Sequence, residues 1–126
     1  WLGPSVARRI QMAVDIARGS GDERARLRRI YDEIGTSLSV PETVGAAFGV
    51  LAMAGGDPRQ TAIYAANLSG DADTVGALAC AIAGAFKGMA AIDPAIARCL
   101  DADEVFAAYH VPQIADGLLG LIERRG

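Results

Sequence analysis

Helix start and stop signals recur at short intervals along this 126-residue chain, and they constrain its fold more than any other feature. Asp57-Pro58 and Asp93-Pro94 each place a capping carboxylate before a proline, which the first turn of a helix accepts without losing a hydrogen bond. Apolar residues between the signals recur every three or four positions, and no segment alternates with a period of two. The pattern predicts an all-α protein, a compact orthogonal or multi-helix bundle with short connections.

The expected helices follow from these signals and from the glycines that end helices. They cover residues 5–17, 23–34, 41–54, 58–68, 73–91, 94–100, 103–110 and 113–124. Glycine inside a helix costs up to about 1 kcal/mol against alanine, so close contact between helices is expected to offset that cost. The glycines concerned are Gly45, Gly49, Gly76, Gly84 and Gly88, of which the last two predict a smooth groove on one face of the fifth helix.

Charge and cysteine content exclude several classes of function. The net charge of −3 gives no reason to expect nucleic-acid binding. Arginines are concentrated in the first 29 residues with acidic residues between them, which favours solvated helix faces with local ion pairs over an anion-binding patch. Cys80 and Cys99 form neither a disulfide framework nor a zinc spacing, and we expect a cytoplasmic protein in which Cys80 is a small buried side chain. The uncharged stretch 74–86 is too short to span a membrane, and no signal peptide or membrane partner is expected.

The segment NLSGDADTVGALACAIAGAFKG, residues 67–88, carries the candidate chemistry. Asp71, Asp73 and Thr74 offer hard oxygen ligands of the kind that Mg²⁺ and Ca²⁺ prefer, and Gly70 allows the tight turn that brings them together. The alternative is that Asp and Thr are ordinary helix caps. A second carboxylate adds repulsion unless a cation is present, and the following helix is so apolar that it should be central in the bundle. Metal ligation is therefore favoured.

This segment resembles the C-terminal signature of the ADP-ribosylglycohydrolase family, and the similarity is strongest over residues 34–92. The matching residues are Gly70, Asp71, Asp73, Thr74, Gly84, Ala85 and Gly88. The resemblance implies a hydrolase with two Mg²⁺ ions that cleaves the bond between the ribose of ADP-ribose and an acceptor. An ADP-ribose-type small molecule or an ADP-ribosylated conjugate would be its substrate. Asp71, Asp73 and Thr74 would be metal ligands, and Asn67, Ser69 and Gly70 would contact the substrate or the ligands.

Departures from the family pattern limit what this chain could do alone. Ser69 replaces the usual first glycine, and Ala72 replaces a small hydroxyl residue. The N-terminal motifs that supply the remaining ligands in the family are absent from these residues, and we expect the catalytic residues to lie with those motifs. We therefore expect residues 1–126 to be a single all-helical unit, the C-terminal part of a larger domain, inactive unless another chain supplies the N-terminal half. The alternative is a non-enzymatic helical structural or interaction protein of the same ancestry. His110 is expected to be a surface or capping residue.

Overall fold

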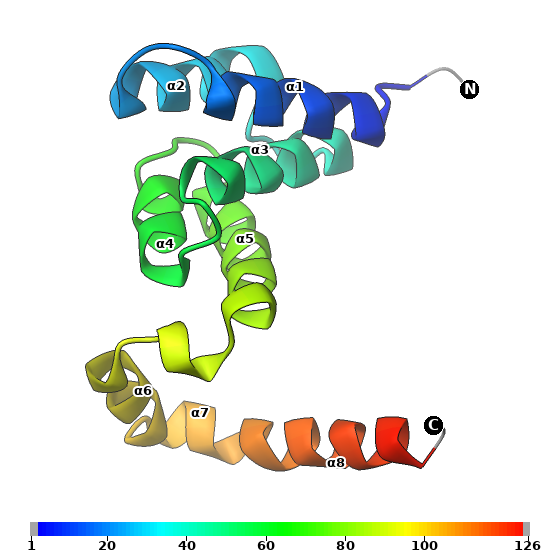
Figure 1. Cartoon of the computed structure of the whole chain (residues 1–126), viewed down its shortest axis with the longest axis vertical. Helices are drawn as coiled ribbons and strands as arrows, with labels where there is room; N and C mark the ends of the chain where they lie inside the picture. Colours follow the sequence, from blue (N-terminus) through cyan, green and yellow to red (C-terminus); the bar gives the residue numbers. More distant parts are fainter. Residues whose placement is uncertain (1–2, 125–126) are drawn as a thin grey trace. The chain divides into compact units, whose positions relative to one another are not determined.

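The computed structural model describes residues 3–124, and its contacts divide the chain into two units, Trp1–Ile92 and Asp93–Gly126. Each regular element in the described part of the chain is a helix (Figure 1), which confirms the all-α prediction. That both units belong to one larger domain stays a prediction.

The first unit follows the start signals read from the sequence. Ser5, Asp22 and Asp57 each accept a backbone N–H with their side chain and begin a helix. The sixteen residues of α5 end at Lys87, earlier than predicted, because Gly88 has a φ of 74°. The elements of this unit are α1 (Val6–Arg18), α2 (Glu23–Arg29), the π-helix η1 (Ile30–Ile34), α3 (Val40–Met53), α4 (Pro58–Ala66), α5 (Ala72–Lys87) and the 3₁₀ turn η2 (Met89–Ala91).

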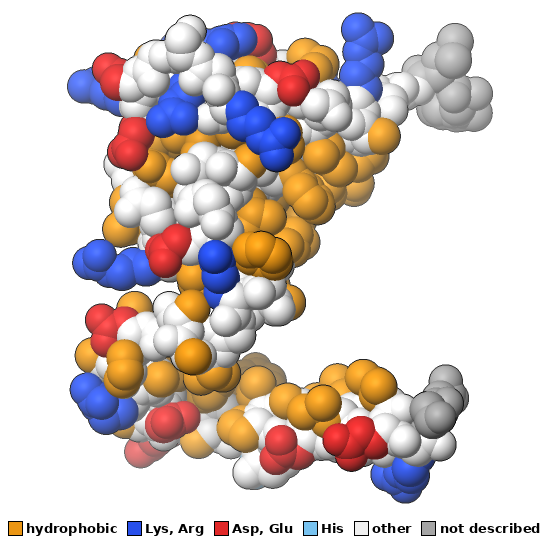
Figure 2. All heavy atoms as spheres, viewed as in Figure 1, with side chains coloured by type: hydrophobic (Ala, Val, Ile, Leu, Met, Phe, Trp, Pro, Cys, Tyr) orange, Lys and Arg blue, Asp and Glu red, His pale blue; other side chains and the backbone are white. Residues whose placement is uncertain are grey.

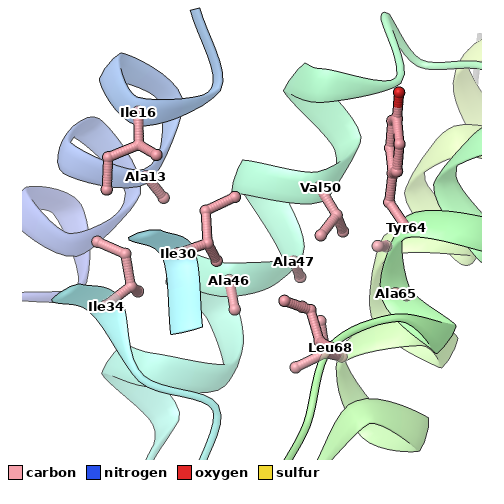
Figure 3. Packing of buried hydrophobic residues seen from close by; sticks show 12 residues of the cluster. Ala13, Ile16, Ile30, Ile34, Ala46, Ala47, Val50, Tyr64, Ala65 and Leu68 are labelled. Atoms are coloured by element: carbon pink, nitrogen blue, oxygen red, sulfur yellow. The ribbon is translucent and has the colours of Figure 1, made fainter. Parts of the chain in front are cut away.

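Helix α3 lies at the centre of this unit, in contact with α1, η1, α4 and α5. Small side chains on α3 let its neighbours approach closely: a Cβ added at Gly45 would lie 2.9 Å from Ile34 Cγ2, and one at Gly49 would lie 3.2 Å from Ala13 Cβ. The close contacts predicted at these glycines are therefore confirmed. The core, shown in Figure 3, includes Ala13, Ile16, Ile30, Ile34, Ala46, Ala47, Val50, Tyr64, Ala65 and Leu68.

Helix α5 is less buried than its sequence predicts. Only the face that carries Val75, Ala79 and Ala83 is buried, whereas Ala77, Ala81 and Ala85 are exposed among the residues that the structure describes. Apart from the adjacent backbone, no atom of residues 3–124 lies within 4 Å of a Cβ built at Gly84 or Gly88, so the close contact predicted there is wrong for this chain. Alanine and glycine carry no charge, and sequence pattern alone therefore did not distinguish a covered face from an uncovered one.

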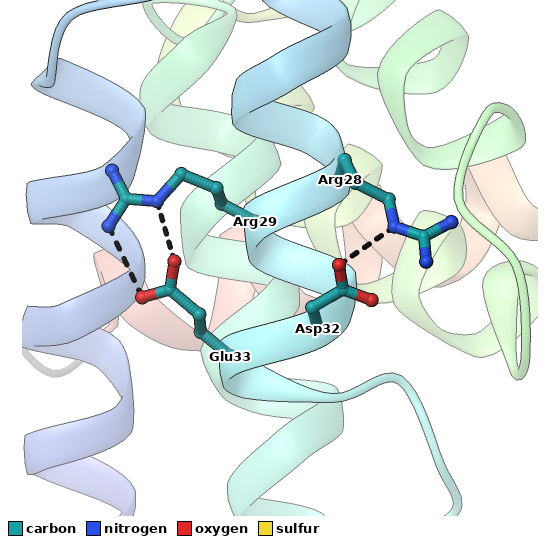
Figure 4. A network of polar contacts seen from close by, with 4 residues as sticks. All are labelled: Arg28, Arg29, Asp32 and Glu33. Atoms are coloured by element: carbon teal, nitrogen blue, oxygen red, sulfur yellow. Dashed lines mark hydrogen bonds and ion pairs between the residues drawn. The ribbon is translucent and has the colours of Figure 1, made fainter.

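The arginine-rich N-terminal region forms the local ion pairs that its charge pattern predicts. Arg28 Nε lies 2.7 Å from Asp32 Oδ2, and Arg29 Nε lies 2.6 Å from Glu33 Oε1, both four residues apart on an exposed face (Figure 4). The Arg29 guanidinium holds the pKa of Glu33 below its usual range. Basic and acidic side chains also alternate over α1 and α2 in the surface view of Figure 2. The reading as a solvated helix face is confirmed.

The second unit contains α6 (Pro94–Asp101), α7 (Glu104–Ala108) and α8 (Val111–Glu123), and Asp93 and Asp103 cap the first two. His110 adopts a left-handed conformation before α8, where it is exposed and makes no side-chain cap. None of the side chains described in this unit is buried. The helical run Glu104–Glu123, with 20 residues and a mean hydropathy of 1.3, is long and apolar enough to cross a membrane, by length and composition only.

Candidate metal centre

The candidate site lies in the short connection between α4 and α5. Leu68 is buried in the core and fixes the start of this connection, and Asn67 Nδ2 donates to the carbonyl of Ile63 at 2.8 Å at the end of α4. Gly70 has a φ of 78°, a conformation that side chains rarely adopt, and it turns the chain into α5. Asn67, Ser69 and Gly70 are exposed beside the turn, and Asn67 forms no hydrogen bond with either aspartate among the described residues.

Asp71 occupies the N-cap position of α5 without acting as a cap. Its side chain accepts no backbone N–H from the helix. Every other aspartate that occupies an N-cap in the described residues accepts one, at 2.7 or 2.8 Å: Asp22, Asp57, Asp93 and Asp103. The alternative that Asp71 is an ordinary capping residue is therefore not supported by its geometry.

The carboxylate of Asp71 instead has one satisfied and one unsatisfied oxygen. Its Oδ1 accepts from Thr74 Oγ1 at 2.9 Å, one turn into α5. Its Oδ2 is buried and has no hydrogen-bond partner among the described residues. A buried, unpaired carboxylate oxygen is costly, and a bound cation would remove that cost.

Asp73 and Thr74 lie in the first turn of α5, and both are exposed. Asp73 borders a groove of about 480 Å³ between α4 and α5, which is otherwise lined by small apolar residues and Cys80. Its carboxylate forms no ion pair with the part of the chain that the structure describes. Burial raises the pKa of the half-buried Cys80 thiol, which makes it a poor nucleophile.

The donor set fits a divalent cation in part. Two carboxylates and a hydroxyl are hard oxygen ligands of the type that Mg²⁺ takes, and the unpaired Asp71 Oδ2 points to a missing positive partner. No group of three or more acidic, histidine or cysteine side chains within residues 3–124 is placed so that it could hold a metal ion. The arrangement can therefore contribute ligands to a metal site but does not complete one.

Two features beside the site were not found from the sequence. The first is Thr36, which contacts the turn from 33 positions away and has no local signal. The second is a cleft of about 1060 Å³ between α2 and α4 that reaches Asn67 and Ser69. In this cleft the Tyr64 hydroxyl donates to Glu23, and the pKa of Tyr64 is raised by burial and by that hydrogen bond.

Comparison with known proteins extends these observations. The sequence profile of the ADP-ribosylglycohydrolase family matches residues 2–126. The chain is also 40% identical over 98 residues to the uncharacterized protein YegU of Escherichia coli (strain K12). That alignment covers 78% of this chain and 29% of YegU, so the chain spans less than a third of the length of this curated relative. No solved structure matches the chain significantly.

Proposed function

The chain belongs to the ADP-ribosylglycohydrolase family, and from this premise we propose that it supplies part of the metal site of a magnesium-dependent hydrolase. Asp71, Asp73 and Thr74 are the proposed ligands. The proposed substrates are ADP-ribosylated conjugates or related ribosyl compounds, whose ribosyl bond is cleaved. Membership of the family supports glycohydrolase activity in general, and the substrate and the metal are our proposals.

One observation carries the metal assignment: Asp71 is the N-cap aspartate that does not cap. Its Oδ2 atom is buried and unpaired, while Thr74 donates to Oδ1. The hydrogen bond from Thr74 fixes the rotation of the carboxylate, so that Oδ2 keeps its lone pairs free. A structural cap would have used those lone pairs on the backbone N–H groups of α5.

Each of these residues has a separate role in the proposed reaction. Asp71 and Asp73 hold the cation by charge, and Thr74 orients Asp71 and offers its own oxygen. Two bound Mg²⁺ ions would supply the orientation of ribose hydroxyls and the polarisation of a water molecule. Asp71 and Asp73 are two residues apart on one turn, so neither is proposed as half of an acid and base pair across the scissile bond.

A calorimetric titration of Mg²⁺ into this chain combined with the N-terminal half of the family domain tests this proposal. Wild type should release or absorb heat on binding, and Asp73→Ala should lose both the heat and the affinity. Asp57→Ala is the matched control, because Asp57 caps α4 through Gln60 N at 2.7 Å and lies outside the proposed site. Identical titrations of wild type and Asp73→Ala, or the absence of binding in wild type, would contradict the proposal.

The completeness of the site separates the enzyme from a second candidate function. No third acidic side chain joins Asp71 and Asp73 in the described residues, and the chain spans 29% of YegU. These facts favour an inactive helical structural or interaction protein for this chain taken alone. We propose that the remaining ligands come from the N-terminal half of the family domain, as a separate chain or the same one. Without them, we expect no release of ADP-ribose from an ADP-ribosylated protein.

A further inference from the structure

Thr36 joins the loop before α3 to the turn that begins α5. It is 4% exposed, and its Oγ1 donates to the carbonyl of Ser69 at 2.6 Å. Its own carbonyl accepts from the Asp71 N–H at 2.7 Å. Thr36 therefore binds the chain on both sides of Gly70, and a Cβ at Gly70 would collide with Thr36.

The loop that carries Thr36 is itself fastened to α3. Thr43 Oγ1 donates to the carbonyl of Ser37 at 2.8 Å, and Glu42 Oε2 accepts from the Ser37 N–H at 3.2 Å. The hydrogen bonds from Ser37 lower the pKa of Glu42, so its carboxylate stays charged near neutral pH. The loop that carries Thr36 is thus held against α3 by these contacts.

We propose that Thr36 is a positioning residue for the metal site, which holds the backbone of Ser69 and Asp71 so that the Asp71 carboxylate is oriented before a cation binds. This inference rests on the proposed function, because it assumes that Asp71 is a ligand. Ligand groups that are held in place in advance bind with less loss of conformational entropy. Loss of the Thr36 hydroxyl should free the carbonyl of Ser69 and loosen the turn that aims Asp71.

Three variants of this chain, each combined with the N-terminal half that is proposed to complete the site, separate this role from a general effect on folding. Thr36→Val removes the hydroxyl and keeps the shape of the side chain, and Thr36→Ser restores the hydroxyl. Thr61→Val is the matched control, because Thr61 is buried in α4 and its hydroxyl has no hydrogen-bond partner in the described structure. Mn²⁺ affinity is measured by electron paramagnetic resonance, and exchange of the Asp71 amide hydrogen is measured by NMR.

Thr36→Val is expected to bind Mn²⁺ about tenfold more weakly, the loss typical when a group that orients a ligand is removed. The Asp71 amide should exchange faster in that variant, whereas Thr36→Ser and Thr61→Val should match wild type in both measurements. Wild-type affinity in Thr36→Val, or equal loss in Thr36→Ser, would overturn the positioning role and leave the metal proposal intact. Absence of Mn²⁺ binding in wild type would instead overturn the proposed function, and the positioning role with it.

Discussion

Substitution of Gly45 by alanine tests the packing on which this fold depends. The new Cβ would lie 2.9 Å from Ile34 Cγ2 and 3.1 Å from Arg9 Cβ. Ile34 is buried, and Arg9 Cβ is fixed to the backbone of α1, so neither atom can withdraw without a shift of its helix. Overpacking of this kind costs about 1–3 kcal/mol, against a gain in helix propensity of up to about 1 kcal/mol. We expect a net loss of about 1 kcal/mol in the free energy of unfolding.

Gly84→Ala is the matched control, because it makes the same change in a helix with no atom within 4 Å of the new Cβ. Only the gain in helix propensity applies there, so the variant should be more stable by about 0.5–1 kcal/mol. Urea unfolding followed by far-UV circular dichroism measures both variants. If Gly45→Ala is as stable as Gly84→Ala, then α1, η1 and α3 are not in the close contact described here.

Three further predictions concern single side chains. Thr61→Val should raise the free energy of unfolding by about 1 kcal/mol, because it removes a buried hydroxyl without a hydrogen-bond partner. A decrease of the same size, measured by urea unfolding, would contradict this. Asp57→Ala should lower the free energy of unfolding by about 1 kcal/mol, because a helix cap is lost. Asp71→Ala, measured without metal, should lower it by less, because Asp71 does not cap α5. Equal decreases in the two variants would show that Asp71 acts as a cap. The Ser37 hydroxyl and N–H hold the pKa of Glu42 below its ordinary value of 4.5, so its stabilising effect is present above that value and is lost as the pH falls through the lowered pKa. In Glu42→Gln, the free energy of unfolding should therefore fall less steeply than in wild type as the pH is lowered. An equally steep fall would refute the stabilising role given to the Glu42 carboxylate.

Helix boundaries were predictable because their signals are local. The carboxylates of Asp57 and Asp93 cap the helices that the Asp-Pro pairs predict, and each bond spans three residues or fewer. The buried residues Ile30 and Ile34 lie on a π-helix, which the helix expected over residues 23–34 did not include. A π-helix needs a single wider turn, and nothing in its sequence marks it.

The assignment of candidate ligands from the sequence stays a prediction, and the contacts that support the turn could not be predicted. The sequence identified Asp71, Asp73 and Thr74, and the structure places Thr74 against Asp71. Whether Asp71 caps α5 depends on its side-chain rotamer, which no spacing determines. The contact of Thr36 with the turn depends on how α3 packs against α5, a tertiary property that has no trace in local sequence.

Anomalous X-ray diffraction from crystals of this chain together with the N-terminal half, grown with Mn²⁺, tests the central claim most directly, because it locates the ion itself. We expect an anomalous peak within ligand distance of Asp71 Oδ2 and the Asp73 carboxylate, and no such peak at these positions in Asp73→Ala. A peak elsewhere on the chain, with Asp71 turned to cap the backbone of α5 as Asp57 caps α4, would contradict the assignment of these residues to a metal site.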